Sequence, residues 1–211
     1  MLTAVLLGFL LGLRHSFDPD HVVAVSTIVA RHRSTASACW IGACWGIGHG
    51  ATLLAIGFLV IALQVAIPDG FARGMELAIG VLLVLLGILN LMAATPASGL
   101  PAHEAPLRAS LARPAAIGLA HGLAGSAPVA LLAMAAMPTP AAALAYLAVF
   151  ALGTIAGMVA FSLALAAPFS RLGSWSDASR WVTAGTGVVS LLFGAWLIYE
   201  IGFAAAQRAA A

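Results

Sequence analysis

A polar stretch from Arg14 to His21 interrupts the first hydrophobic segment of the chain, which otherwise runs from about Leu2 to Ala30. The stretch contains five ionisable side chains and a proline, and neither apolar flank reaches the roughly 20 residues that a helix needs to cross a bilayer. Charged side chains at membrane depth are costly and are usually retained for a function. A solvated loop between two short helices is the alternative, and we favour a functional site.

Pro19 predicts that this segment is not one straight helix. Proline has no N–H, so an unbroken helix would leave the carbonyl of His15 without its partner, and the proline ring would clash with that carbonyl. On a regular helix, His15, Asp20 and His21 would also point in three different directions. We therefore expect the helix to break around Ser16 to Asp20, which would let the three side chains converge.

The composition of the whole chain indicates a polytopic membrane protein. Of its 211 residues, 63% are hydrophobic and 8% are charged, whereas a soluble domain carries about 25% charged residues. The net charge of +2 is too small to indicate a nucleic-acid partner, so the expected partners are the lipid bilayer and a small ligand. The N-terminal segment has no basic start and no small-residue cleavage site, so we interpret it as mature protein rather than a signal peptide.

Six hydrophobic segments predict an all-α integral membrane fold of six transmembrane helices, within a single domain over residues 1–211. A polar linker at 95–113 divides the chain into two halves, 1–94 and 114–206. After the first segment, the apolar segments cover about 36–67, 75–94, 114–137, 141–168 and 181–206.

The two halves repeat each other at a nearly constant spacing. The stretch Gly12-Leu13-Arg14-His15 lies 106 residues before Gly118-Leu119-Ala120-His121, and glycines of the later segments match at 107 residues. Halves with three spans each must be inverted relative to one another, a common plan of secondary transporters that places the substrate near the midplane between interrupted helices. Chance spacing in a glycine-rich membrane chain is the alternative.

Arginine predicts the orientation of the chain in the membrane. Positive residues accumulate in loops on the cytoplasmic side, so we expect an inner-membrane protein whose two termini both lie outside the cytoplasm. The loops after the first, third and fifth segments hold six of the nine arginines: Arg31, Arg33, Arg108, Arg113, Arg171 and Arg180.

The candidate metal ligands are His15, Asp20, His21 and His49. Three imidazoles and one carboxylate suit Ni²⁺, Co²⁺, Zn²⁺ or Cu²⁺ and exclude an oxygen cage of the Ca²⁺ type. His49 lies in the middle of the second segment, where a lone histidine is ordinarily a packing residue, and the neighbouring cluster favours a ligand. His121 is the repeat mate of His15 without a carboxylate beside it, so it either supports the site or is structural.

Arg14 and Asp18 are expected next to this site. They lie four residues apart, so Arg14 is a candidate partner for Asp18, which would leave Asp20 for the metal ion. His32 and His103 lie in predicted loops and are expected to be solvated. Cys39 and Cys44 point in different directions on a helix and cannot form a disulfide there.

The polar stretch resembles a known signature. Arg14-His15-x4-Asp20-His21 is similar to the H-x4-D-H motif of the nickel/cobalt transporters, and Trp45-x2-Gly48-His49-Gly50-x-Thr52 resembles that family's second motif. The compact six-span form looks most like the UreH-type members. The resemblance implies a transporter that carries Ni²⁺ or Co²⁺, with no organic cofactor, and binds the ion through the four candidate ligands. We expect uptake by alternating access of the two halves.

The second half departs from the pattern of that family. Its acidic motifs in later helices would fall near 122–127 and 157–162, where this chain has Ser126 and Ser162 and no carboxylate. We therefore expect these serines beside the site or along the path of the ion rather than as its main ligands.

Three other interpretations compete with uptake, and one of them is a passive structural membrane protein whose polar stretch is a solvated loop. Another is export of a metal ion or an anion by a related architecture. The sequence leaves open whether a cytoplasmic chaperone accepts the metal ion. The third interpretation is an intramembrane metalloenzyme, which is disfavoured because the chain has neither an H-E-x-x-H motif nor a series of histidine boxes. A G-x4-G-K-S/T nucleotide-binding motif is also absent from the sequence, so any use of ATP would need another subunit. We expect a transporter rather than an enzyme.

Overall fold

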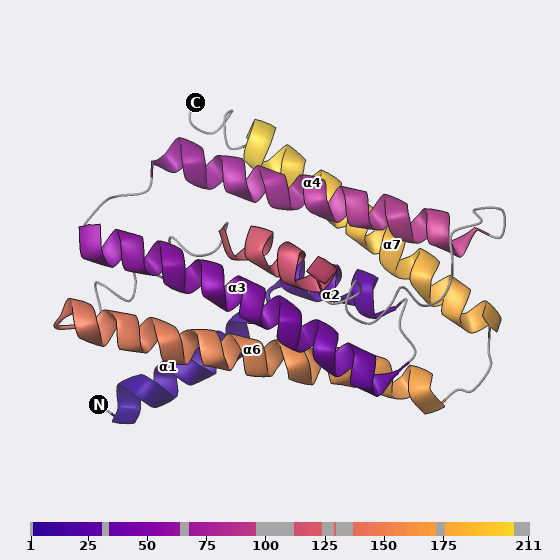
Figure 1. Cartoon of the computed structure of the whole chain (residues 1–211). Helices are drawn as coiled ribbons and strands as arrows, with labels where there is room; N and C mark the ends of the chain where they lie inside the picture. The colour runs from indigo at the N-terminus through magenta and orange to yellow at the C-terminus, as the bar shows by residue number, and fades with distance from the viewer. Residues whose placement is uncertain are drawn as a thin grey trace.

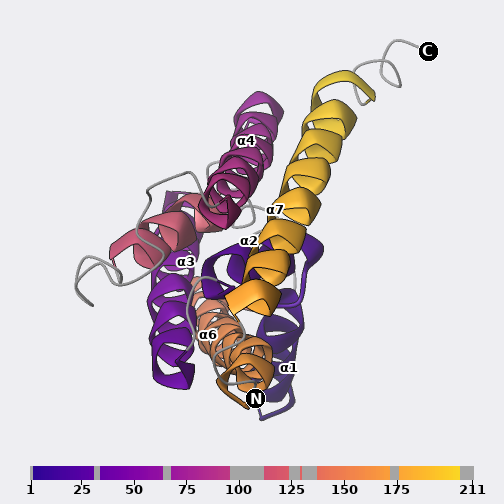
Figure 2. The same cartoon turned by 90° about the vertical axis from the view of Figure 1, so that its right-hand side faces the viewer.

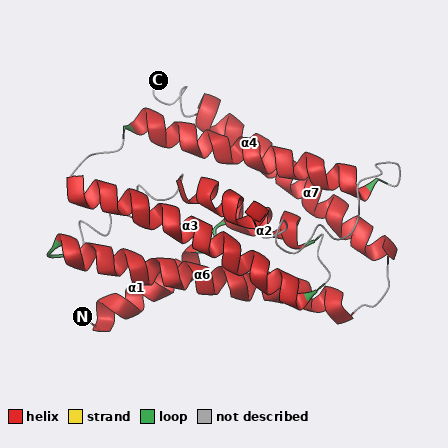
Figure 3. Ribbon diagram, in the orientation of Figure 1, coloured by secondary structure: helices red, strands yellow, loops and turns green. Residues whose placement is uncertain are grey.

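The computed structural model describes residues 2–30, 34–63, 68–95, 112–123, 129, 137–171 and 176–204. Within these residues every regular element is a helix, so the predicted all-α class is confirmed (Figure 3). A further helix covers 112–123. The labelled elements are α1 (Leu2–His15), α2 (Pro19–Val29), α3 (Thr35–Leu63), α4 (Asp69–Ala94), α6 (Pro140–Arg171) and α7 (Ser176–Tyr199), with α7 continued by the π-helical η2 (Glu200–Ala204).

Four of the described helices are long and apolar enough to cross a membrane: α3, α4, α6 and α7. Large apolar side chains on them stay exposed, among them Phe58, Trp181 and Leu192, and an extensive exposed apolar surface is what a lipid-facing protein needs. The first predicted segment is instead two short apolar helices, α1 and α2, joined by a turn. Because the fourth segment is described only at 112–123 and 129, six complete spans stay a prediction.

The long helices form two antiparallel pairs that lie in separate layers (Figures 1 and 2). In the pair of α3 and α6, a methyl group on Gly42 would lie 2.7 Å from the carbonyl oxygen of Met158, while Gly50 faces Ala151. In the pair of α4 and α7, a methyl group on Gly87 would lie 2.7 Å from the carbonyl oxygen of Gly187. Glycine at these positions lets the two backbones approach closely.

The short helices join the layer of α3 and α6. Gly12 of α1 lies directly against the carbonyl of Phe150 in α6, and Gly118 of the 112–123 helix lies directly against the carbonyl of Trp45 in α3. A side chain at either glycine would collide with backbone, so these contacts fix how deep each short helix sits.

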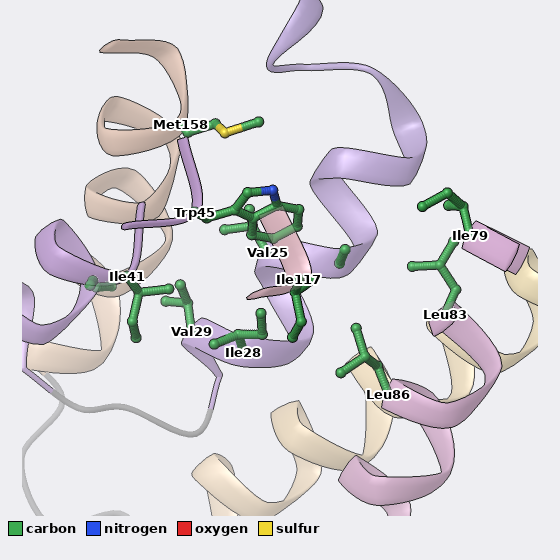
Figure 4. Packing of buried hydrophobic residues seen from close by; sticks show 13 residues of the cluster. Val25, Ile28, Val29, Ile41, Trp45, Ile79, Leu83, Leu86, Ile117 and Met158 are labelled. Carbon is green, nitrogen blue, oxygen red and sulfur yellow. The ribbon is translucent and has the colours of Figure 1, made fainter. Parts of the chain in front are cut away.

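α2 lies between the two layers and carries the main core (Figures 2 and 4). Carbonyl groups at the C-terminal end of α2 accept hydrogen bonds from helices of the second layer. Asn90 Nδ2 of α4 donates to the carbonyl of Thr27 at 2.8 Å, and Thr183 Oγ1 of α7 donates to that of Ala30 at 3.4 Å. The buried core residues labelled in Figure 4 are Val25, Ile28, Val29, Ile41, Trp45, Ile79, Leu83, Leu86, Ile117 and Met158.

Candidate metal centre

The first hydrophobic segment is broken where the sequence predicts. α1 ends at His15, the residues Ser16 to Asp18 form a turn, and α2 begins at Pro19. Proline is well suited to the first helical position, because an N–H there has no acceptor within the helix. The amide of Phe17 donates to the carbonyl of Arg14 at 2.9 Å, which closes the turn. The prediction of a broken helix is confirmed.

The break brings three imidazoles together from three helices. The ring centroid of His15 in α1 lies 4.7 Å from that of His21 in α2 and 5.3 Å from that of His49 in α3, and the rings of His21 and His49 are 4.9 Å apart. One nitrogen from each ring lies within 4.8 Å of the other two. His21 and His49 are 2% and 0% exposed, so the group is shielded from bulk solvent.

These rings carry buried nitrogens that have no hydrogen-bond partner in the described part of the chain. The unpartnered atoms are Nε2 of His15, Nε2 of His21 and both ring nitrogens of His49. Buried polar atoms are nearly always hydrogen-bonded, and several unpaired nitrogens in one place need an explanation. A shared metal ion would account for one nitrogen of each ring, because neutral imidazole is a ligand of choice for divalent transition metals.

A carboxylate lies within hydrogen-bond distance of Nδ1 in two of the three rings. Asp18 Oδ2 lies 2.7 Å from Nδ1 of His15, and Asp20 Oδ1 lies 3.1 Å from Nδ1 of His21. A carboxylate at Nδ1 favours the tautomer with the proton on Nδ1, which leaves the lone pair of Nε2 for a metal ion. Asp18 therefore pairs with His15, whereas the sequence suggested Arg14; the side chain of Arg14 is exposed.

Asp20 also bonds to the second half of the chain. Its Oδ2 lies 2.8 Å from Nε2 of His121, which is buried in the 112–123 helix. Asp20, His21 and His121 therefore form a second group with one ligand atom each within 4.8 Å of one another. The four predicted ligands do not form a single group: His15, His21 and His49 make one, and Asp20 falls in the other.

Trp45 packs against both groups. Its ring is stacked on His21 at a centroid distance of 6.4 Å and meets His121 edge-on at 5.6 Å. The side chain is fully buried, so it provides an apolar wall that keeps water from the imidazoles.

A cavity of about 200 Å³ reaches the first group from one side. Its lining includes His15, which is 14% exposed, and Asp18, which is 48% exposed. Sequence reasoning did not find its other walls, because the aromatic residues of α6 give no local signal of a path. The lining residues are Leu11, Arg14, His15, Asp18, Val129, Tyr146 and Phe150.

The urease accessory protein UreH of Bacillus sp. (strain TB-90) is 32% identical to this chain over 212 residues, in a match that covers 96% of this chain and 93% of that protein. The chain belongs to the UreH family. It is thus a UreH-type member of the nickel/cobalt transporters, as the two motifs predicted.

Two plant proteins are more distant relatives of this UreH-type chain. The chloroplast proteins FOR GROWTH AND FERTILITY 2 and 1 of Arabidopsis thaliana are each 26% identical to it, over 176 and 200 residues. The chain spans about half of their length, 47% and 52% respectively. No family model and no solved structure match the chain.

Other predicted residues of this UreH-type protein lie away from the imidazoles or cannot be placed. Ser162 of α6 is buried against Gly42, about two turns of α3 from His49. Ser126, His32 and His103 lie outside the described residues, as do Arg31, Arg33 and Arg108 of the predicted cytoplasmic loops.

Proposed function

We propose that this protein carries Ni²⁺ or Co²⁺ across the inner membrane as a transported substrate, without catalysing a reaction on it. The observation that carries the proposal is the convergence of three imidazoles with buried, unpartnered nitrogens, two from the broken first segment and one from α3. The name of the Bacillus relative, a urease accessory protein, supports a nickel-related role.

The ion is held by His15, His21 and His49. Neutral imidazoles suit late first-row divalent ions and disfavour Mg²⁺ and Ca²⁺, which prefer oxygen. Asp18 and Asp20 sit one ring away from the ion, where they orient His15 and His21 and offset its double charge. Because the direct ligands are neutral and the two carboxylates lie behind them, the ion can bind and still be released.

Alternating access needs two halves that can exchange conformations around a fixed site. We propose that the halves are inverted repeats. Contacts that are equivalent under such a relation support it. The packing of α1 on α6 matches that of the 112–123 helix on α3, with the residue pairs Gly12–Phe150 and Phe9–Gly153 in one, and Gly118–Trp45 and Ala115–Gly48 in the other.

The glycine contacts also refine the register of the proposed repeat. They relate Gly48 to Gly153 at a spacing of 105 residues, whereas glycine spacing alone related Gly46 to Gly153 at 107. In the new register Thr154 is the mate of His49, so the second half offers no imidazole at that position. The proposed site is therefore asymmetric, with its first ligands in one half.

Uptake is the direction that we propose. The cavity lies beside Tyr146, near the start of α6, and the loop before α6 is on the outer side if the arginine-rich loops are cytoplasmic. An ion from outside would then meet Asp18 first and His15 next.

Transport by reconstituted protein tests the proposal. Proteoliposomes holding the unchanged protein should accumulate radioactive Ni²⁺, and His15→Ala, His21→Ala and His49→Ala should each reduce uptake at least tenfold. His103→Ala, in a predicted loop, is the control and should leave uptake unchanged. Uptake that persists in all three cluster variants, or that appears only when the ion is loaded inside and leaves the vesicle, would contradict proposed uptake through this site.

A further inference from the structure

We propose that the protein has a second ion position, formed by Asp20, His21 and His121, which takes the ion over from the position at His15, His21 and His49. The inference rests on the proposed function and adds a step to it. The two positions share His21, and they draw on different helices for their remaining ligands.

The geometry of the second group is already compact. Asp20 bridges the two imidazoles, at 3.1 Å from Nδ1 of His21 and 2.8 Å from Nε2 of His121, and the two ring centroids are 4.6 Å apart. His21 and His121 are 2% and 1% exposed. The nitrogen of His121 that faces this group is Nε2, while Nδ1 is buried and has no hydrogen-bond partner in the described part of the chain; the proton of the neutral ring can therefore sit on Nδ1 when Nε2 binds the ion.

His21 presents a different nitrogen to each group. Nδ1 faces Asp20 and, beyond it, His121, while Nε2 is unpartnered in the cluster with His15 and His49. When the ion moves from Nε2 to Nδ1, the proton of the neutral ring moves from Nδ1 to Nε2, so His21 changes tautomer and offers the ion one nitrogen in either position. Two dications this close would repel strongly in a buried site, so the positions are filled in turn.

The ligand sets of the two positions differ in charge, which favours transfer of the ion from the first to the second. The first position has three neutral imidazoles, whereas the second has two imidazoles and a carboxylate that takes direct part in binding. The ion therefore moves from a neutral set of ligands to one that carries a compensating charge. Since both are nitrogen-rich, each remains selective for the same class of transition-metal ion.

The helices that carry these ligands are held by different neighbours. The 112–123 helix is seated on α3 through Gly118 against Trp45 and Gly122 against the backbone of His49, so His121 and His49 move together. Asp20 and His21 lie on α2, whose far end is bonded to α4 and α7. A shift of α2 against α3 would change which group of ligands is closed around the ion.

Replacement of His121 by glutamine separates this proposal from a purely structural role of the bridge. The amide group of His121→Gln can still donate to Asp20, but it is a poor ligand for Ni²⁺. We expect the dissociation constant for Ni²⁺, measured by calorimetry on purified protein, to stay within threefold of the unchanged protein. Uptake of radioactive Ni²⁺ into proteoliposomes should fall at least thirtyfold.

A second variant pair detects the new position directly. His15→Ala removes a ligand of the first position only and should retain weak Ni²⁺ binding, which the combined variant His15→Ala/His121→Gln should lose. Unchanged uptake in His121→Gln, a parallel loss of affinity and uptake, or equal binding by the single and combined variants would each overturn the second position. If the unchanged protein itself bound no Ni²⁺, the proposed function would fail and the second position with it.

Discussion

At the scale of single residues, the two aspartates of the polar stretch have different partners. Asp18 contacts only the ring of His15 among the described histidines, whereas Asp20 links His21 to His121 across 101 residues of sequence. Both act on imidazoles through Nδ1 or Nε2, and neither belongs to the group of His15, His21 and His49. In the proposed function, their contribution to the first ion position is to orient and charge-balance its ligands.

Asp18→Asn should weaken Ni²⁺ binding without abolishing it. The amide keeps the shape of the carboxylate but loses its charge and its preference for a protonated Nδ1 on His15, and loss of such a partner costs about 10- to 100-fold in metal affinity. Calorimetric titration with Ni²⁺ measures the change. Ser162→Ala, a buried position away from the imidazoles, should stay within a few fold, and an equal loss in both variants would show that the effect is not local.

The grouping of His15, His21 and His49 could be predicted, but the hydrogen-bond partners around it could not. His15 and His21 follow from the motif around Pro19, and His49 follows from its glycine-flanked place in the next segment. The contact between Asp20 and His121 depends on how deep the 112–123 helix sits on α3. Depth of that kind is set by backbone contacts at glycines, which sequence periodicity does not encode. The repeat spacing of His15 and His121 was the one available signal.

At the scale of helices, close backbone contacts at glycine position the short helices that carry the ligands. Gly12 and Gly118 each meet a carbonyl of the neighbouring helix, so α1 and the 112–123 helix have no freedom to approach further. The break after His15 was predictable because proline alone dictates it. The register of α1 against α6 was not, since many glycines in the chain could have served.

Gly118→Ala should lower the stability of the folded protein. The added methyl group would collide with the carbonyl of Trp45, and overpacking of this kind costs about 1–3 kcal/mol. The melting temperature in detergent should therefore fall by several degrees. Gly185→Ala in α7 is the matched control, because nothing lies within 4 Å of its added methyl group. A melting temperature of Gly118→Ala equal to that of the control would contradict this role of the glycine contact.

At the scale of the whole molecule, the second layer has the same internal relation as the first. Gly80 approaches Gly194 as Gly187 approaches Gly87. The repeat mates Gly80 and Gly187 are 107 residues apart in sequence, as are Gly87 and Gly194. Ser190 donates to the carbonyl of Leu83 at 2.7 Å, and these two residues are also separated by 107. A residue that contacts its own mate lies next to the axis of a two-fold relation, which supports inverted halves.

The proposed orientation can be tested by labelling. In a variant without Cys39 and Cys44, a single cysteine at Asp69 should react with an impermeant thiol reagent in intact cells, because the loop before α4 is expected outside. A cysteine at Ser34 should react only after the membrane is opened, since it follows the arginine-rich loop of the first segment. Labelling of Ser34→Cys but not of Asp69→Cys in intact cells would reverse the orientation and, with it, the proposed direction of transport.

X-ray absorption at the nickel edge of the Ni²⁺-loaded protein counts the imidazoles around the ion. We expect about three imidazole nitrogens at roughly 2.0–2.1 Å, typical of histidine on a late divalent metal. His49→Ala should lower that number by one in whatever ion remains bound, whereas Ser162→Ala should leave it unchanged. A first shell of oxygen without imidazole scattering, or a spectrum that His49→Ala leaves unaltered, would contradict the account.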